Sequence, residues 1–276
     1  MWDMSGASSS VSVINNNVFE EFIKVANQKQ LQNCQLLKHQ PDLDRFGMHY
    51  LSFNYINEND MNKFLNEIVP LFTKQVIDLI ECETREQHKS NLWHELRYAR
   101  ITTSKAFDVS RCKTSDGSLI AYIMGARTPD TPAMKRGRRL EDLVRTTIEV
   151  EYGKIECCGL VISQTYPMLA ASPDGILNND TIIEIKCPSS ENTFKNYINT
   201  KNITAKFNAQ VQLQMFALGF KKCLFCVADS DFENNKRVEV VKVDYDEQFI
   251  NTIMRTLVNF WETNIFPLLY KIKLDK

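Results

Sequence analysis

The sequence has no long apolar run, and this shortage excludes whole classes of protein. No stretch approaches the roughly 18 uninterrupted apolar residues that a membrane-spanning helix requires. Residues 1–12 are polar and rich in serine, without the apolar segment of a secretory signal peptide. We therefore expect an intracellular protein, cytoplasmic or nuclear, that is neither secreted nor inserted into a membrane.

Cysteine pairs at the spacing of a zinc site are also missing. The chain has 8 cysteines, including the adjacent Cys157 and Cys158 and the pair Cys223 and Cys226, but no second pair at zinc-site spacing. These cysteines lie in apolar, strand-like runs. We interpret them as reduced thiols in the core, because free cysteine is usually buried there.

The chain lacks an excess of positive charge, since its formal net charge at pH 7 is −1. A balance of this kind argues against a partner as anionic as DNA, whose phosphates usually meet a basic surface. Two local clusters argue the other way. They comprise Lys135, Arg136, Arg138 and Arg139, and further Arg97, Arg100, Lys105, Arg111 and Lys113. Each cluster is either a solvated charged face or a surface for phosphates.

The periodicity of apolar residues predicts a helical N-terminal part. Apolar residues recur at helical spacing over residues 18–37, after a stretch expected to be disordered over residues 1–14. Asp60 is a candidate N-cap for a helix over residues 61–80, which Pro70 is expected to kink or split. We therefore expect a helical N-terminal extension over residues 1–88.

The rest of the chain, residues 89–276, is expected to be one α/β domain, for which 43% hydrophobic residues supply a sufficient core. The strands expected first in the chain form an antiparallel meander, and the whole forms a central mixed sheet flanked by helices. Helices are predicted over residues 89–99, 138–150, 194–215 and 246–266, and strands over 155–163, 168–171, 181–187, 222–229 and 237–245.

The most informative segment runs from Asp174 to Lys186. Residues 181–186 are rich in strand formers, and side chains in a strand alternate faces, so Glu184 and Lys186 point the same way. Turn residues at 177–180 let the chain fold back and bring Asp174 alongside Glu184. Two carboxylates and an ammonium suit Mg²⁺ or Mn²⁺ and the hydrolysis of a phosphodiester. A single match of this kind is more often a solvated surface hairpin.

Four blocks of sequence resemble the lambda exonuclease and YqaJ-type viral recombinase family, within the PD-(D/E)XK nuclease superfamily. In order, they are Trp93 to Arg97 with Ile101 to Lys105, Gly137 to Glu141, Ala171 to Gly175 with Glu184 to Pro188, and Ala209 to Gln212. The resemblance extends from about residue 90 to residue 265 and implies a restriction-endonuclease-like α/β fold. It also implies a Mg²⁺-dependent DNA exonuclease that acts 5′ to 3′ from phosphorylated duplex ends in recombination, repair or viral DNA processing.

The resemblance assigns roles in catalysis. Asp174, Glu184, Glu141 and the main-chain carbonyl of Ile185 hold Mg²⁺, for which Mn²⁺ is expected to substitute. Lys186 activates the attacking water and Gln210 orients it. The plainer interpretation of Glu141 is an exposed helical residue paired with Arg145, and Gln210 would then be a surface amide.

The resemblance also assigns DNA contacts. Arg97 and Ser104 hold the 5′-phosphate, and further contacts are expected from Lys105, Arg138, Arg139 and Gln212. The plainer alternative is that Ser104 only caps a helix N-terminus and that Arg97 is a surface residue of a helix. Phe207 stands where the family's best-known member has a tyrosine, so a hydroxyl is absent there. A homotrimer is implied by the family; a structure-selective or site-specific endonuclease and a non-cutting DNA-binding module remain alternatives.

Overall fold

The computed structural model describes residues 42–114, 117–126, 129–200 and 202–275. The described residues from Leu43 onward form one compact unit. The disordered stretch expected over residues 1–14 and the helix predicted over residues 18–37 lie outside the described residues.

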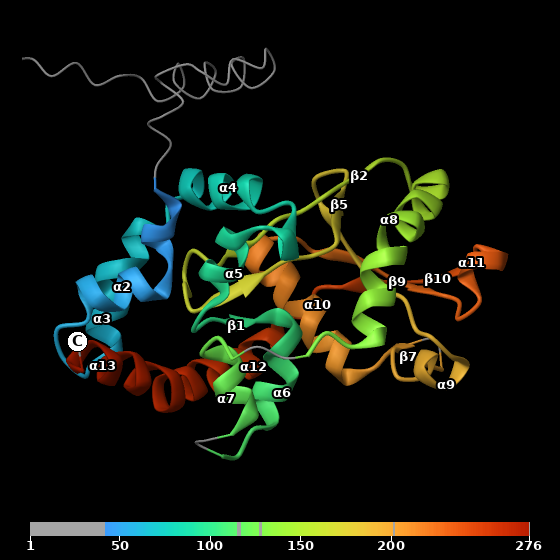
Figure 1. Ribbon diagram of the computed structural model, residues 1–276. Coiled ribbons are helices and arrows are strands. Elements are labelled where there is room, and N and C mark those ends of the chain that lie inside the picture. Colours follow the sequence, from blue (N-terminus) through green and yellow to red (C-terminus); the bar gives the residue numbers. More distant parts are fainter. Residues whose placement is uncertain (1–41, 115–116, 127–128, 201, 276) are drawn as a thin grey trace, which may run out of the picture. The chain divides into compact units, whose positions relative to one another are not determined.

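A five-stranded mixed sheet forms the centre of the described unit, in the order β10-β9-β6-β5-β2 (Figure 1). Its strands are β2 (Ile155–Glu156), β5 (Gly175–Leu177), β6 (Thr181–Lys186), β9 (Lys222–Ala228) and β10 (Val238–Asp244). β6 pairs antiparallel with β5 and parallel with β9, and β9 pairs antiparallel with β10. The predicted central mixed sheet is therefore confirmed.

Two helices, α8 (Pro132–Tyr152) and α10 (Ala205–Leu218), pack against opposite faces of this sheet. The alternation of side chains along β6 sends its odd-numbered residues toward α8 and its even-numbered residues toward α10. The α8 side includes Leu140, Val144, Ile148, Ile183 and Ile185, and the α10 side includes Ile182, Val211, Met215 and Phe225. Since both faces are covered, β9 is almost continuously apolar, and every residue of β6 except Lys186 is buried.

A smaller sheet has the order β1-β4-β3 and contains β1 (Ile101–Thr102), β3 (Val161–Ile162) and β4 (Leu169–Ala171). The single strand predicted over residues 155–163 is wrong, because β2 and β3 belong to different sheets. Gly159 lies at the crossing, where its N–H donates to Glu81 Oε1 at 2.9 Å. A Cβ at Gly159 would overlap the Glu81 carbonyl oxygen, so the close approach of α4 (Lys74–Glu83) requires glycine there.

Residues 43–89 are helical and share a core with the rest of the unit. They form η2 (Leu43–Phe46), α2 (Met48–Tyr55), α3 (Met61–Ile68), η3 (Val69–Leu71), α4 and η4 (Gln87–Lys89). As predicted, Asp60 caps α3 by accepting from two backbone N–H groups, and the helix gives way to a 3-10 turn at Pro70. Phe64 and Phe72 lie in the same buried cluster as Trp261. Residues 43–89 thus belong to the compact unit that begins at Leu43.

Arg100 joins three parts of this unit from within the core. Its side chain is 1% exposed, and its guanidinium donates to the carbonyls of Phe46 and Pro167, each at 2.7 Å, and of Leu96 at 2.5 Å. Its hydrogen-bonding capacity is thus engaged inside the protein. Arg100 therefore does not belong to the surface cluster in which the sequence placed it.

Further elements surround the two sheets. They are α5 (Asn91–Arg97), η5 (Thr103–Lys105), α6 (Ala106–Arg111), α7 (Ser118–Ile123), α9 (Glu191–Phe194), β7 (Ile198–Asn199), β8 (Asn202–Ile203), α11 (Phe232–Asn235), α12 (Glu247–Phe260), the π-helical η6 (Trp261–Ile265) and α13 (Phe266–Leu274). The helix predicted over residues 194–215 is interrupted by the β7–β8 hairpin, whose β-branched and Asn residues disfavour a helix. Within the described residues, no helix has the length and apolar character to cross a membrane.

Candidate active site

The β5–β6 hairpin brings Asp174 next to Glu184. Asn178 and Asn179 adopt positive φ angles of 52° and 57°, which form the turn that joins the strands. Asp174 then donates its N–H to the Ile183 carbonyl at 3.1 Å, and its Oδ2 accepts from the Ile185 N–H at 2.6 Å. These bonds hold the Asp174 carboxylate against the residues that flank Glu184.

Glu184 is 2% exposed and has donors on both carboxylate oxygens. Its Oε1 accepts from Lys186 Nζ and from Gln210 Nε2, the latter at 2.6 Å, and its Oε2 accepts from Gln214 Nε2 at 2.7 Å. The Lys186 ammonium also lies 5.3 Å from the ring centroid of Phe207. A buried carboxylate requires such partners, since burying an unpaired charge is costly.

Gln214 is a contact that the sequence interpretation missed. It follows Gln210 by four residues on α10, so the two side chains share one helix face and grip the same carboxylate. This spacing was the available signal. The Oε1 of Gln214 is buried without a hydrogen-bond partner among the described residues.

Gln212 faces away from this site. Its Nε2 donates to the Asp244 carbonyl and its Oε1 accepts from the Asp246 N–H, both at 2.8 Å. The side chain is 2% exposed and both of its polar ends are engaged. The expected DNA contact from Gln212 therefore has no support in the structure, where this residue connects α10 to the segment that follows β10.

Glu141 approaches from α8, and Arg145 links it to Asp174. Arg145 Nη2 donates to Glu141 Oε1 at 2.8 Å and to the Asp174 carbonyl at 3.2 Å. The ion pair within α8, which was the plainer interpretation of Glu141, is thus present. The same pair also places Glu141 beside the carboxylates of the hairpin.

The three carboxylates influence one another electrostatically. Burial raises the pKa of Asp174 well above its ordinary value, and the negative charges of Glu184 and Glu141 raise it further. Burial also raises the pKa of Glu141, against the opposing charge of Arg145. Burial would lower the pKa of Lys186, but Glu184 and Asp174 outweigh it and keep that pKa above its ordinary value. Lys186 is therefore an ammonium ion at neutral pH.

The carboxylate oxygens of this site are the type of ligand that a hard divalent cation prefers. Asp174, Glu184 and Glu141 supply oxygen donors, and their mutual repulsion is what a bound cation would relieve. Within the described residues, no three His, Cys, Asp or Glu side chains converge as a ready-made metal site. Binding would require the carboxylates to exchange some of the Lys186, Arg145 and backbone contacts for the cation.

Arg97, expected at the 5′-phosphate, is connected to this centre through Trp93. The Arg97 guanidinium stacks 3.8 Å from the Trp93 ring centroid, and Trp93 Nε1 donates to Ser172 Oγ at 3.0 Å, two residues before Asp174. Burial lowers the pKa of Arg97, and its interactions with Tyr122 oppose this change.

Lys105 meets the same Tyr122 from η5. Its Nζ lies 4.6 Å from the Tyr122 ring centroid, and 3.7 Å from a carboxylate oxygen of Asp108. Ser104 is exposed in η5 and lies 3.3 Å from the Thr102 hydroxyl. Arg97 and Lys105 thus meet at one aromatic residue, and no contact joins Ser104 directly to either of them among the described interactions.

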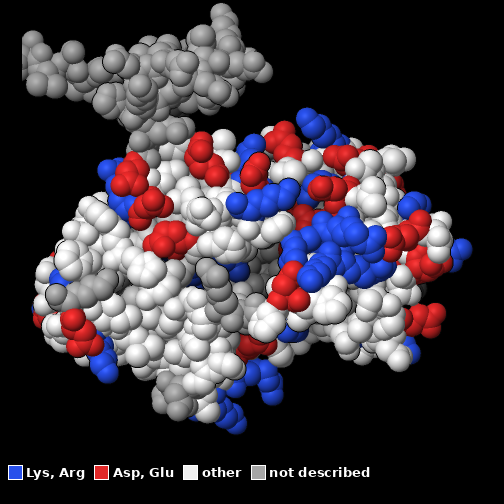
Figure 2. Space-filling view, viewed as in Figure 1, with Lys and Arg blue, Asp and Glu red and all other residues white. Residues whose placement is uncertain are grey.

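The first half of α8 carries Arg136, Arg138 and Arg139, which we call the arginine surface. Figure 2 shows a dense group of Lys and Arg there, beside a hollow and edged by acidic residues. Arg138 pairs with Asp130 at 2.5 Å, whereas Arg136 and Arg139 both pair with Glu233 of α11. Arg138 and Arg139, which were expected to contact DNA, are therefore already ion-paired with acidic residues of the protein.

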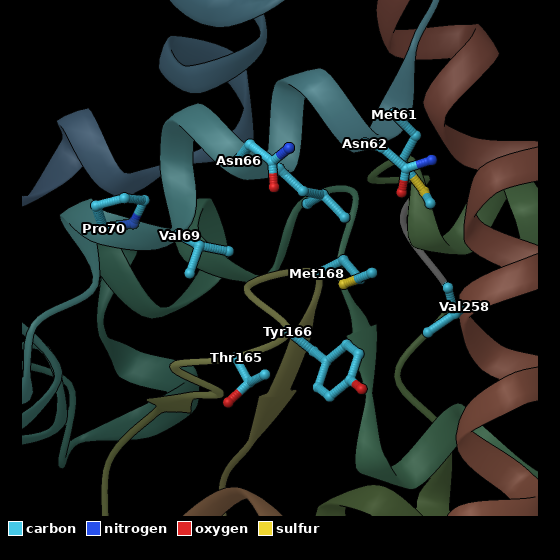
Figure 3. A pocket seen from close by; sticks show the side chains of 10 residues that line it. Met61, Asn62, Asn66, Val69, Pro70, Thr165, Tyr166, Met168 and Val258 are labelled. Carbon is cyan, nitrogen blue, oxygen red and sulfur yellow. The ribbon is translucent and has the colours of Figure 1, made fainter.

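A separate pocket of about 510 Å³ lies between α3, the segment before β4 and α12 (Figure 3). Uncharged residues line it, among them Asn62, Asn66, Tyr166, Met168 and Val258. None of the site carboxylates contributes to it. The pocket is thus distinct from the candidate active site.

Comparison with known proteins shows which domain this part of the chain resembles. Residues 92–221 match the YqaJ-like viral recombinase domain. The alkaline nuclease of human cytomegalovirus (strain Merlin) is 29% identical over 140 residues, which are 41% of this chain and 24% of that protein. This chain therefore spans about a quarter of the length of that relative.

Two solved structures share the fold. An alkaline exonuclease from Laribacter hongkongensis has a TM-score of 0.57 and 26% sequence identity, and the match covers 68% of this chain and 100% of that one. The shutoff and exonuclease protein of Kaposi's sarcoma-associated herpesvirus has a TM-score of 0.50 at 11% identity, covering 88% and 96% of the two chains. At that identity the second likeness concerns the fold alone.

All the carboxylates of the site, together with Lys186, Gln210 and Gln214, lie within the matched residues. The family resemblance predicted from the sequence blocks is confirmed. Residues 92–221 are similar to the YqaJ-like viral recombinase domain, and an alkaline exonuclease has a similar fold.

Proposed function

We propose that the protein is a metal-dependent deoxyribonuclease that degrades duplex DNA 5′ to 3′ from phosphorylated ends. The observation that carries this proposal is the hairpin that sets Asp174 beside Glu184 in a nuclease domain of this family. The process it serves would be recombination, repair or the processing of viral DNA inside the cell. A homotrimer is the assembly proposed for it, which sedimentation or light scattering would test.

The cation is proposed to be Mg²⁺, with Mn²⁺ as a substitute. Asp174, Glu184, Glu141 and the carbonyl of Ile185 would hold it, and it would supply Lewis acidity and an activated water. Glu184 is well suited to this role because Gln210 and Gln214 fix both of its oxygens. Fixed ligands reduce the reorganisation that binding and reaction require.

Lys186 is proposed to act as a cation and not as a base. Its ammonium is stabilised by Glu184 and Asp174, so it can donate hydrogen bonds to the attacking water or to a phosphate oxygen. Gln210 is proposed to orient the water from the same side, since its amide already lies at Glu184. Arg97, Ser104 and Lys105 are proposed to hold the 5′-phosphate, and Arg138 and Arg139 the backbone.

One assay tests the proposal. Purified protein is incubated with 5′-phosphorylated linear duplex, 5′-hydroxyl linear duplex and covalently closed circular DNA, with Mg²⁺ or with EDTA, and Asp174→Asn serves as the inactive control. We expect Mg²⁺-dependent loss of the phosphorylated linear DNA and survival of the circle. Cleavage of the circle would instead establish an endonuclease, and intact DNA in all lanes would leave a binding module.

A further inference from the structure

Glu233 occupies the arginine surface from a different element of the fold. It lies on α11, between β9 and β10, and it uses both carboxylate oxygens. Arg139 donates to Oε1 and, at 3.0 Å, to Oε2, while Arg136 donates to Oε2 at 3.0 Å. The hydrogen bonds from Arg139 lower the pKa of Glu233 to about 2, so this carboxylate is ionised at neutral pH.

Arg136 connects the arginine surface to the segment that follows Lys186. Arg136 Nε donates to the carbonyl of Pro188 at 3.2 Å, two residues after Lys186. Arg136 also precedes Glu141 by five residues on α8, which is about 8 Å along a helix axis. That length corresponds to roughly two nucleotides of a DNA strand. A strand that extends from the carboxylates along α8 by this length would therefore reach the turn of the helix that carries these arginines.

A carboxylate and a phosphate present paired oxygens to a guanidinium in the same forked geometry. The Arg139 side chain is 58% exposed and that of Glu233 is 44% exposed. An ion pair this exposed contributes little to stability and is easily exchanged for another anion. On Arg139 the contacts of Glu233 are thus those that a DNA phosphate would make, at a position where exchange is easy, whereas the side chain of Arg136 is 16% exposed.

We infer that Glu233 stands in the place of a DNA phosphate on Arg136 and Arg139 and competes with DNA for them. The inference rests on the proposed function, because it takes DNA as the ligand of this surface. As a consequence, Glu233 weakens DNA binding and favours dissociation of the DNA strand from the arginine surface. Removing its charge is expected to tighten binding.

The fold does not need the Glu233 carboxylate for its shape. Arg136 is held independently by the carbonyls of Ser230, at 2.9 Å, and Pro188. α11 is anchored by Phe232, which is fully buried in the core beneath α8. Glu233→Gln should therefore leave the fold and the arginines in place and remove only the charge.

The test measures affinity without cleavage. The full chain is titrated into a fluorescent 5′-phosphorylated duplex in EDTA, and anisotropy is recorded between about 50 and 200 mM salt, where phosphate contacts dominate. Glu233→Gln is expected to tighten binding about two- to tenfold and to steepen the salt dependence by up to roughly one unit of slope. Thermal unfolding of each variant checks the fold.

Glu58→Gln is the matched control. Glu58, in the loop between α2 and α3, pairs with Lys63 of α3 at 2.6 Å in a similarly exposed ion pair, so the substitution changes the net charge equally. Its affinity for DNA should equal that of the unaltered protein. If both variants tighten binding equally, the effect is one of net charge and the inference fails.

A double-mutant cycle with Arg139→Ala asks whether Glu233 acts through the arginine. The gain from Glu233→Gln should be clearly smaller in the Arg139→Ala background. An undiminished gain, or unchanged or weaker binding by Glu233→Gln alone, overturns the inference. Cleavage is scored separately with Mg²⁺, so a protein that binds as expected but does not cut refutes the proposed function and not this inference.

Discussion

The candidate active site and the arginine surface both pair opposite charges, but in different surroundings. Glu184 is 2% exposed, whereas the side chains of Glu233 and Arg139 are 44% and 58% exposed. Charges interact strongly where water is excluded and weakly where it screens them. Substitutions at the first site should therefore change catalysis by orders of magnitude, and substitutions at the second should change affinity by small factors.

Neutralising a carboxylate of the candidate active site is expected to have the largest effect. Glu184→Gln and Asp174→Asn keep the size of each side chain but remove a charge that the cation needs. We expect cleavage to fall about a thousandfold or more, as when an activating metal is lost. Single-turnover cleavage with Mg²⁺ measures it, with circular dichroism as the control for folding. Near-normal turnover by either variant would remove that residue from the site.

Lys186→Ala separates the ammonium from the metal ligands. We expect cleavage to fall about a hundredfold or more, because the group that positions the water or phosphate is gone. Mn²⁺ affinity should be kept or increased, since the ammonium and a cation compete for Glu184. Calorimetric titration with Mn²⁺ distinguishes the two effects. Loss of Mn²⁺ binding as complete as in Asp174→Asn would mean that Lys186 holds the site together.

Arg97→Ala tests a side chain of intermediate exposure, since Arg97 is partly buried against Trp93. A charged hydrogen bond to a terminal phosphate is worth roughly 1.5–3 kcal/mol, so preference for phosphorylated over hydroxyl ends should fall about ten- to a hundredfold. Initial rates on paired substrates that differ only in this phosphate give the ratio. An unchanged ratio would place the end-binding pocket elsewhere and favour endonuclease activity.

What the sequence predicted well depends on local rules. Alternation along β6 sets Glu184 and Lys186 on one face, and two asparagines with positive φ angles close the turn. The four-residue spacing of Gln210 and Gln214 on a helix likewise indicates that both side chains contact the same group. Such features depend on neighbours within a few residues, so a single sequence is enough to infer them.

The features that the sequence did not predict join segments far apart in the chain. Arg100 reaches carbonyls 54 and 67 residues away, and Glu233 reaches Arg139 across 94 residues. Backbone carbonyls carry no sequence signal, and one exposed glutamate resembles any other. For the same reason the division of residues 155–163 between two sheets depended on α4, which contacts Gly159 from 78 residues away.

Gln214→Ala tests how far the buried network, rather than its charges alone, supports catalysis. The substitution leaves Glu184 Oε2 without its donor and opens space beside it, whereas Gln210 still holds Oε1. We expect a loss of roughly tenfold in cleavage, comparable to losing one hydrogen bond to a charged group. The Mg²⁺ concentration for half-maximal rate should rise as well. A change in stability alone, with the same rate and metal dependence, would mean that Gln214 only fills the core.

The smallest expected effect is on thermal stability without metal, which reports how far the buried Asp174 charge destabilises the folded protein. The pKa of Asp174 is raised by burial, Glu184 and Glu141, so the folded protein binds a proton more tightly there than the unfolded chain does. Stability from this group is complete below the unfolded pKa of about 4 and is lost as pH rises through the higher folded pKa.

Asp174→Asn removes the charge but keeps an oxygen for the Ile185 N–H. In EDTA at about pH 8, its Tm should rise by about 2–4 °C, the change that roughly 1 kcal/mol produces in a protein of this size. Near pH 4 the difference should vanish, and Mg²⁺ should stabilise the unaltered protein more than the variant. A variant less stable than the unaltered protein at both pH values would show that the Asp174 carboxylate supports the fold.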